Sequence, residues 1–218
     1  MRLLEDRRLR DMYDLLHDVP DSSGMAGGIF EAIAHRMLSG KDTPQPTAMI
    51  SDGNFPPTFS TTDAQPPPAS PHDSTRAVMT VDLLHDLSDV TPDSNRYYIP
   101  VSATNPLFDS FTIALDAGQH TAVVSIYQIT ISLKHRGSGD GYLLIHKIMA
   151  HSRKLLDCQK NYKPNIKVKY FLVCPEDGSE YQWKMPSGWN KNNAHYDQIW
   201  EVFCICVPSH YLTVHRVY

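Results

Sequence analysis

Apolar residues recur at helical spacing twice within the first 40 residues. The first stripe consists of Leu3, Leu4, Met12, Leu15 and Leu16. It must end before Pro20, because proline cannot donate an intrahelical hydrogen bond. The second stripe runs to Gly40 and consists of Met25, Ala26, Ile29, Phe30, Ile33 and Met37. Asp21, Ser22 and Ser23 precede it as candidate caps. The pattern predicts two helices in residues 1–40 that contribute to a core.

From residue 97 onward the pattern changes to strands and one further helix. Period-two alternation predicts a strand over 107–115 and, after a turn, a longer strand from Ala122 to Lys134. A glycine-rich turn, HRGSGDG, leads to an amphipathic helix from about Tyr142 to Leu156. Strands follow at Ile166 to Cys174 and at Ile199 to Val207, each ended by proline. A hairpin, a crossover helix and further strands predict an α/β fold with a mixed sheet flanked by helices.

Residues 41–75 have a different composition from the rest of the chain. Eight of the 16 prolines lie here, among Ser, Thr, Asp and Gln. Such a segment cannot cover a core and favours extended, solvated chain. We therefore predict a disordered Pro-rich insertion over 41–75, between N-terminal helices at 1–40 and the main part of the domain at 76–218. A surface loop is the simpler interpretation, and a Pro-rich ligand for a protein partner is the alternative.

The net charge of −4 is distributed unevenly along the chain. Residues 1–120 contain 8 Lys or Arg and 17 Asp or Glu, whereas residues 121–218 contain 12 and 7. The basic excess includes a run of Arg153, Lys154, Lys160, Lys163, Lys167 and Lys169. Two interpretations remain open: a surface that contacts phosphates, or a solvated helix end and strand edge.

Several sequence features that are absent indicate where the protein is located and which cofactors it does not use. It contains no apolar run of the roughly 18 residues that span a bilayer, and no export signal, so we expect no membrane association. We expect an intracellular protein, cytoplasmic or nuclear, with secretion by a route without a classical signal left open. The four cysteines are then reduced thiols. Cys204 and Cys206 share one strand face, where core positions are favoured over a zinc site. The motif GxxxxGK[ST] is absent, so no nucleotide cofactor is expected.

The hairpin brings two polar residues together. If a four-residue loop joins Asp116 to Thr121, antiparallel register pairs residues whose numbers sum to 237, which sets Asp109 opposite Gln128. Thr130 then lies diagonally from Asp109, within about 8 Å. A loop one residue longer or shorter would move Asp109 to the other face of the sheet.

Three segments carry a family resemblance: GGIFEAIAHRML, YYIPVSATNPLFDSF and IYQITISLKH, followed by a helix and a strand that ends at Pro175. They resemble the C-terminal domain of Crinkler and retrotransposon-hot-spot-type effector proteins. That domain is regarded as a divergent member of the PD-(D/E)xK restriction-endonuclease-like superfamily. The resemblance covers most of the chain outside the Pro-rich insertion. It implies a restriction-endonuclease-like fold, a Mg²⁺ or Mn²⁺ cofactor and nucleic acid, in particular DNA, as the partner.

The resemblance also assigns roles to individual residues. Glu31 matches the acid of the first core helix, Asp109 the metal-binding Asp of the second strand, and Gln128 and Thr130 the two ends of the ExK motif. An active nuclease uses carboxylates to hold Mg²⁺ and a lysine to orient the attacking water. Gln128 brings an amide oxygen without charge, and Thr130 brings no cation. Lys134 is the nearest lysine on the predicted strand face, roughly 13 Å further along the strand.

In the resemblance, the metal ligands are Glu31, Asp109 and Gln128. The catalytic residues are Asp109, Gln128, Thr130 and Lys134. Three functions are possible for a domain with these residues. The chain is a metal-dependent nuclease, a nucleic-acid-binding domain with a degenerate site, or an inactive protein-interaction module, such as the tail of a truncated NTPase-containing protein. Plain structural roles are the fourth alternative. In these roles Asp109 caps a turn, Gln128 and Thr130 face solvent, and Glu31 pairs with a histidine one helical turn away.

Overall fold

A computed structural model describes most of the chain. The described residues are 2–17, 23–40, 43–54, 56–62, 78–85, 90, 95–101, 107–156, 164–186 and 201–212. The helices are α1 (Arg2–His17), α2 (Ser23–Leu38), α3 (Gly141–Leu156) and α4 (Ser209–Leu212). They confirm the two predicted N-terminal helices and the predicted crossover helix. Within these residues, no helix is both long and apolar enough to cross a membrane.

The described strands form two sheets. A seven-stranded mixed sheet has the order β1-β11-β9-β7-β6-β5-β4. Its strands are β1 (Thr47–Ala48), β4 (Thr80–Leu84), β5 (Arg96–Pro100), β6 (Ser110–Asp116), β7 (Thr121–Ile129), β9 (Asn165–Pro175) and β11 (Glu201–Val207). A four-stranded sheet has the order β2-β3-β10-β8. Its strands are β2 (Ile50–Ser51), β3 (Thr58–Ser60), β8 (Lys134–Arg136) and β10 (Gln182–Lys184).

The centre of the large sheet combines an antiparallel meander with parallel strands. Strands β5, β6 and β7 are antiparallel neighbours, and the β6–β7 pairs run from Ser110↔Tyr127 to Asp116↔Thr121. These pairs have the predicted sum of 237, so the four-residue turn and the predicted hairpin register are confirmed. Helix α3 then carries the chain across the sheet to β9, which pairs in parallel with both β7 and β11.

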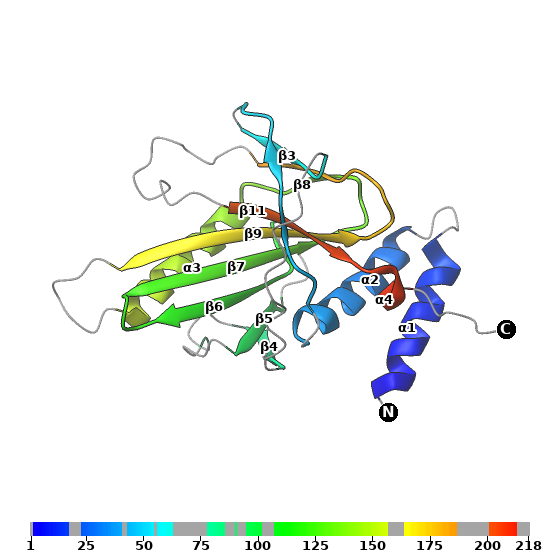
Figure 1. Cartoon of the computed structure of the whole chain (residues 1–218). Coiled ribbons are helices and arrows are strands. Elements are labelled where there is room, and N and C mark those ends of the chain that lie inside the picture. Colours follow the sequence, from blue (N-terminus) through cyan, green and yellow to red (C-terminus); the bar gives the residue numbers. More distant parts are fainter. Residues whose placement is uncertain are drawn as a thin grey trace.

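Helices cover the two faces of the large sheet unequally (Figure 1). Helix α3 lies along one face, where Ile145 and Ile148 pack with Ile126 and Tyr170. Helices α1, α2 and α4 gather at one end of the other face, over a second cluster that includes Phe30. Successive side chains of a strand point to opposite faces, so one strand contributes to both clusters.

The four-stranded sheet joins the main core through an aromatic stack. Trp183 of β10 is 1% exposed. Its ring stacks on Tyr170 of β9 at 4.1 Å between centroids and on Phe59 of β3 at 5.6 Å. The second sheet therefore shares the hydrophobic core on the α3 side of the large sheet.

Part of the predicted disordered insertion is ordered, which corrects that prediction for residues 43–54 and 56–62. These residues form β1, β2 and β3. Met49 is buried, and its amide donates to the carbonyl of Val202 at 2.9 Å. The prolines flank very short strands, where a missing amide hydrogen is tolerated. Composition gave no sign of this pairing, because its partners lie far away in the sequence. The rest of the segment lies outside the described residues.

Strand β7 ends at Ile129, so the predicted strand from Ala122 to Lys134 is too long. The amide of Thr130 still donates to the carbonyl of Val173 at 2.9 Å, and the Thr130 hydroxyl then accepts the amide of Ser132 at 3.0 Å. That local side-chain bond turns the chain away from the sheet. Lys134 begins β8 and pairs with Gln182 in the second sheet.

Candidate functional site

Asp109 and Gln128 meet where β6 begins and β7 ends. The amide nitrogen Nε2 of Gln128 donates to Oδ2 of Asp109 at 2.8 Å, and the backbone amide of Ile129 donates to the same oxygen at 2.6 Å. The amide of Asp109 in turn donates to the carbonyl of Tyr127 at 2.8 Å. The predicted juxtaposition of Asp109 and Gln128 is therefore present as direct contact. Gln128 is buried, whereas Asp109 keeps partial access to solvent.

The protonation of Asp109 is set mainly by its burial. Loss of water around the carboxylate raises the pKa of Asp109 to about 7. The hydrogen bond from the Ile129 amide lowers the pKa, and the negative charge of Glu31 raises it further. Glu31 is thus close enough to act on Asp109 electrostatically. Among the described residues, no cation contributes to lowering the pKa of Asp109.

Glu31 belongs to a separate chain of polar contacts. The Nε2 atom of His35 lies 3.3 Å from Oε1 of Glu31, and its Nδ1 atom lies 2.9 Å from the hydroxyl of Tyr97. The Tyr97 hydroxyl also bonds the hydroxyl of Ser110 at 2.5 Å. Tyr97 is buried in the cluster beneath α2. The spacing of Glu31 and His35 had indicated their pairing, but no sequence signal pointed to the roles of Tyr97 and Ser110.

Glu31 and Gln128 approach the site from opposite faces of the sheet. Gln128 alternates with Tyr127 and Ile129 of the α2-side cluster, so its side chain points to the α3 side. Glu31 is on α2, is 48% exposed in its side chain and is bound to His35. Within the described residues, Asp109 is the only one of the three that interacts with both others: it accepts a hydrogen bond from Gln128, and the charge of Glu31 raises its pKa.

Thr130 and Lys134 do not supply the missing cation. Thr130 is half-buried and its hydroxyl is used in the turn to Ser132. Lys134 is exposed in the second sheet, where its charge lowers the pKa of Glu180. The structure thus brings Asp109, Gln128 and the backbone of Thr130 together at one end of β7. Lys134 instead lies close enough to Glu180 to affect its pKa.

A Mg²⁺ ion is implied by the resemblance, and the described side chains do not fit it. Mg²⁺ requires octahedral oxygen ligands, commonly carboxylates. Gln128 turns its amide nitrogen toward Asp109, while its oxygen Oε1 is buried without a hydrogen-bond partner in the described structure. Glu31 is engaged with His35. Asp109 and Gln128 therefore form a closed, hydrogen-bonded pair rather than two sides of a carboxylate cage.

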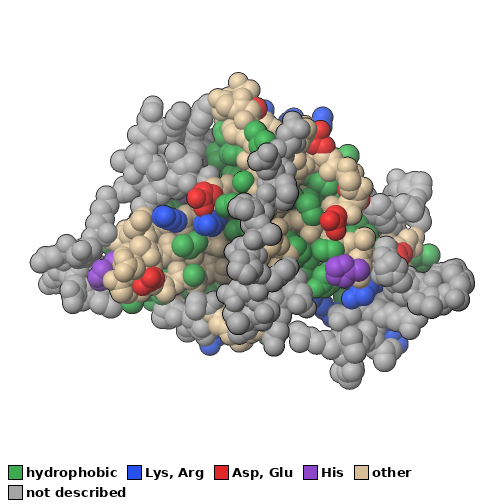
Figure 2. Space-filling view, viewed as in Figure 1, with side chains coloured by type: hydrophobic (Ala, Val, Ile, Leu, Met, Phe, Trp, Pro, Cys, Tyr) green, Lys and Arg blue, Asp and Glu red, His purple; other side chains and the backbone are tan. Residues whose placement is uncertain are grey.

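The basic run is divided between the two faces of the large sheet. Lys167 and Lys169 alternate with Val168 and Tyr170 of the α3-side core, so they point to the opposite face, whereas Arg153 and Lys154 are on α3. Lys169 pairs with Glu201 at 3.0 Å. On the face viewed in Figure 2, the described Lys and Arg side chains are scattered among acidic, polar and apolar ones. Lys160 and Lys163 lie outside the described residues.

Comparisons with protein-family models, with curated proteins and with solved structures found no match for this chain. The resemblance to Crinkler-type proteins consequently rests on the three sequence segments and on the positions of Asp109 and Gln128. Its implied activity remains a prediction.

The sequence did not predict a cluster of three cysteines. Cys174 of β9 and Cys204 and Cys206 of β11 lie together, with their sulfur atoms all within 4.8 Å of one another. Thiol hydrogen bonds from Cys174 and Cys204 lower the pKa of Cys206, while the neighbouring thiols and burial raise the pKa of Cys174. The alternation of Cys204 and Cys206 was visible in the sequence, but the register that adds Cys174 was not.

Proposed function

We propose that this chain is a restriction-endonuclease-like domain with a degenerate catalytic site, which binds nucleic acid and cleaves it slowly or not at all. The contact between Asp109 and Gln128 is the observation that carries the proposal. It occupies the start of one strand and the end of its antiparallel neighbour, at the positions that the resemblance gives to the metal-binding Asp and the first end of the ExK motif. A glutamine amide here donates a hydrogen bond to the Asp109 carboxyl group, where an active enzyme uses a metal ion.

The order of elements supports the same proposal. After α2, which carries Glu31, and the intervening strands β1 to β4, the chain forms the antiparallel strands β5, β6 and β7, then β8, the crossover helix α3 and the parallel strand β9. The resemblance places its acids on the first core helix and on the second and third of these strands, and Glu31, Asp109 and Gln128 lie on or beside those elements. The missing lysine has a direct reason in the sequence, since Thr130 stands at its position.

The first experiment repairs the site. We expect the double variant Gln128→Glu/Thr130→Lys to bind Mg²⁺ or Mn²⁺ and to nick supercoiled plasmid, because it restores a second carboxylate and a cation beside Asp109. Wild type should show at least tenfold less cleavage. Adding Asp109→Asn to the repaired protein should abolish the gained activity. Asp116→Asn, at the opposite end of the same hairpin and exposed, is the matched control and should not. A correctly folded repaired variant that neither binds metal nor cleaves contradicts the proposed lineage.

Nucleic-acid binding is tested separately by its salt dependence. Phosphate contacts make the logarithm of the affinity fall linearly with the logarithm of salt concentration. We expect wild type to bind single- or double-stranded DNA with such a slope. Lys167→Ala should weaken binding, whereas Lys184→Ala, an exposed lysine of the second sheet, serves as control. Absence of salt-sensitive binding to DNA and RNA would leave the fold assignment standing and reject the binding function.

A protein-interaction module is the second candidate, and exposed apolar side chains favour it. Met12 and Leu15 of α1 are 46% and 71% exposed, and Met25 of α2 is 62% exposed. Met12 and Leu15 are one turn apart, so they share a helix face. Two variants distinguish the two candidate functions. If the domain acts on nucleic acid, Leu15→Glu should leave DNA binding unchanged. If it acts on a protein, Lys167→Ala should leave binding of the protein partner unchanged.

A further inference from the structure

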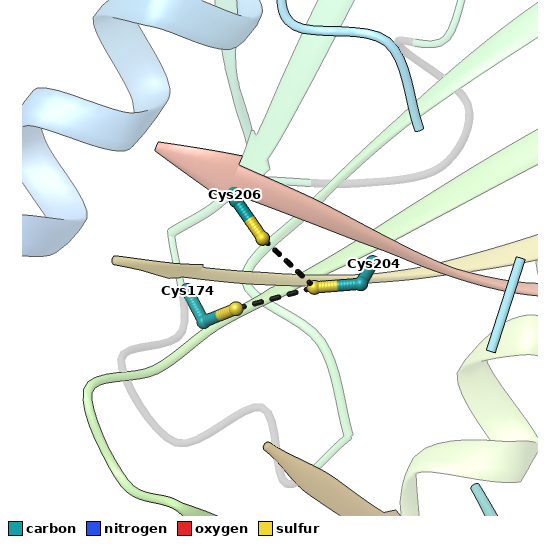
Figure 3. Close-up of side chains that lie close together, drawn as sticks. All are labelled: Cys174, Cys204 and Cys206. Atoms are coloured by element: carbon teal, nitrogen blue, oxygen red, sulfur yellow. Dashed lines mark hydrogen bonds between the residues drawn. The ribbon is translucent and has the colours of Figure 1, made fainter. Parts of the chain in front are cut away.

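Three cysteines converge at the end of two parallel strands. Cys174 lies directly opposite Cys206 in the β9–β11 register, and Cys204 lies two residues earlier on β11. Residues two apart on a strand share one face, so all three side chains point to the same side of the sheet. Figure 3 shows the three sulfur atoms turned toward one another between the two strands. The arrangement depends on sheet register and not on a loop.

The distances between the sulfur atoms are close to those of a metal thiolate site. The Sγ atoms of Cys174 and Cys204 lie 3.2 Å apart, those of Cys204 and Cys206 lie 3.7 Å apart, and all three fit within 4.8 Å. Three sulfurs bound at about 2.3 Å to one ion would be about 3.8 to 4.0 Å apart. The observed range brackets that value, so binding would require shifts of less than about 1 Å.

The environment of the cluster suits a soft ion and gives it an entrance. Cys174 and Cys204 are buried at 0% and 2% exposure, whereas Cys206 is only half-buried. An ion can therefore enter beside Cys206 and become enclosed by the two buried thiols. Thiolate ligands select Cu(I) and Zn(II) and are poor ligands for Mg²⁺, which prefers oxygen.

We propose that Cys174, Cys204 and Cys206 bind one soft, thiophilic metal ion of the Cu(I) or Zn(II) class. Each thiol that binds loses its proton to solvent and forms one sulfur–metal bond, with no change in the oxidation state of the sulfur. Cu(I) is satisfied by the three thiolates alone, whereas Zn(II) takes a water as fourth ligand on the side of Cys206. The site uses neither Asp109 nor Gln128 as a ligand, and it does not depend on the proposed function.

Disulfide formation is the competing chemistry of the same thiols. A disulfide between Cys174 and Cys204 requires an external two-electron oxidant and a sulfur–sulfur distance of about 2.05 Å, against the observed 3.2 Å. Such a bond would close one pair and leave Cys206 unused. Metal binding uses all three sulfurs, which is why we assign it to this cluster.

The experiment titrates the reduced, full-length protein with Zn²⁺ and, under anaerobic conditions, with Cu(I), each against a colorimetric chelator. We expect one equivalent of metal per chain for at least one of the two ions. Cys206→Ser should weaken its binding at least tenfold. This variant is preferred to Cys174→Ser, because the half-buried position tolerates the hydroxyl better than the buried one. The control is Cys158→Ser, which changes the remaining cysteine and should retain metal binding. Cys158 lies outside the described residues.

A measurement on wild type removes any dependence on variant folding. Bound metal should protect the half-buried Cys206 from alkylation in the folded protein, as read by mass spectrometry, and should leave the labelling of Cys158 unchanged. Failure to bind either ion stoichiometrically overturns the proposal. Binding that persists unweakened in Cys206→Ser, or that protects only Cys158, overturns it equally. Air oxidation to a Cys174–Cys204 disulfide, with no metal uptake by the reduced protein, assigns the cluster to redox chemistry instead.

Discussion

Asp109 is a carboxyl group whose burial, more than any charged neighbour, determines when it ionises. Its pKa is raised from 3.8 to about 7 in the folded protein. Between these two values the folded state keeps a proton that the unfolded state has lost. The free energy of unfolding therefore falls as the pH rises from about 4 to about 7, and it stays at the lower level above pH 7. With respect to this group, wild type should be most stable below about pH 4.

Asp109→Asn tests this linkage. Asparagine cannot ionise, so the variant should lose the fall in stability between pH 4 and 7 and gain on wild type by on the order of a few kcal/mol at pH 8. Urea unfolding at pH 4, 5.5 and 8 measures the difference. The exposed Asp116→Asn serves as control and should track wild type at every pH. A stability difference between Asp109→Asn and wild type that does not vary with pH would contradict the proposed cause.

At this scale the sequence predicted contacts that one turn determines and missed those that depend on the whole sheet. Asp109 opposite Gln128 followed from counting residues across a four-residue loop. The contact of His35 with Tyr97 spans 62 residues and two different elements, and the thiols of Cys174 and Cys204 meet only because β9 and β11 pair in parallel. Local spacing carries no information about such register.

Helix α3 begins at a glycine for a reason of packing. A Cβ atom placed on Gly141 would overlap the side chain of Leu107 and lie 3.3 Å from the Leu107 Cα atom. Leu107 is fully buried just before β6 and its carbonyl accepts the hydroxyl of Tyr170 at 3.0 Å. Neither the helix start nor Leu107 can shift without disturbing the core that positions Asp109.

Gly141→Ala is expected to lower the free energy of unfolding by about 1 to 3 kcal/mol, as overpacking of a core does. Gly28→Ala is the matched control. Gly28 is also helical, but nothing lies within 4 Å of the position that a Cβ atom would take there. Because alanine is the better helix former, that control should be neutral or stabilising by up to about 1 kcal/mol. Chemical denaturation measures the free energy of unfolding of both variants. If Gly141→Ala were as stable as wild type, the close approach to Leu107 would be easily relieved and the prediction would be wrong.

The alternation of apolar and polar residues did not predict where strands begin and end. The alternation from Ala122 to Lys134 continues through Thr130, yet the Thr130 hydroxyl forms a turn and Lys134 joins another sheet. Conversely, the prolines near β1 and β3 suggested disorder, although Met49 anchors that segment in the core. In both cases a single hydrogen bond or buried side chain outweighed the pattern of its neighbours.

At the scale of the whole molecule, folding redistributes charges that are close in the sequence. Arg153 and Lys154 are carried by α3 on one side of the large sheet, and Lys167 and Lys169 point to the other side. The sequence had left open whether these residues form one phosphate-contacting surface, but a crossover helix and the strand after it lie in different layers. Any phosphate-binding surface must therefore be built from one of these groups with residues from elsewhere in the chain.

The two sheets depend on each other through Trp183. Its ring lies between Tyr170 of the large sheet and Phe59 of the small one, so its removal opens a cavity that neither sheet can fill alone. We expect Trp183→Ala to lower the free energy of unfolding by about 3 to 5 kcal/mol, and Trp183→Phe to lower it less, because phenylalanine keeps part of the stack. Urea denaturation followed by both fluorescence and circular dichroism should give one cooperative transition for wild type. If Trp183→Ala stayed within about 1 kcal/mol of wild type, the small sheet would be a separate, weakly coupled unit.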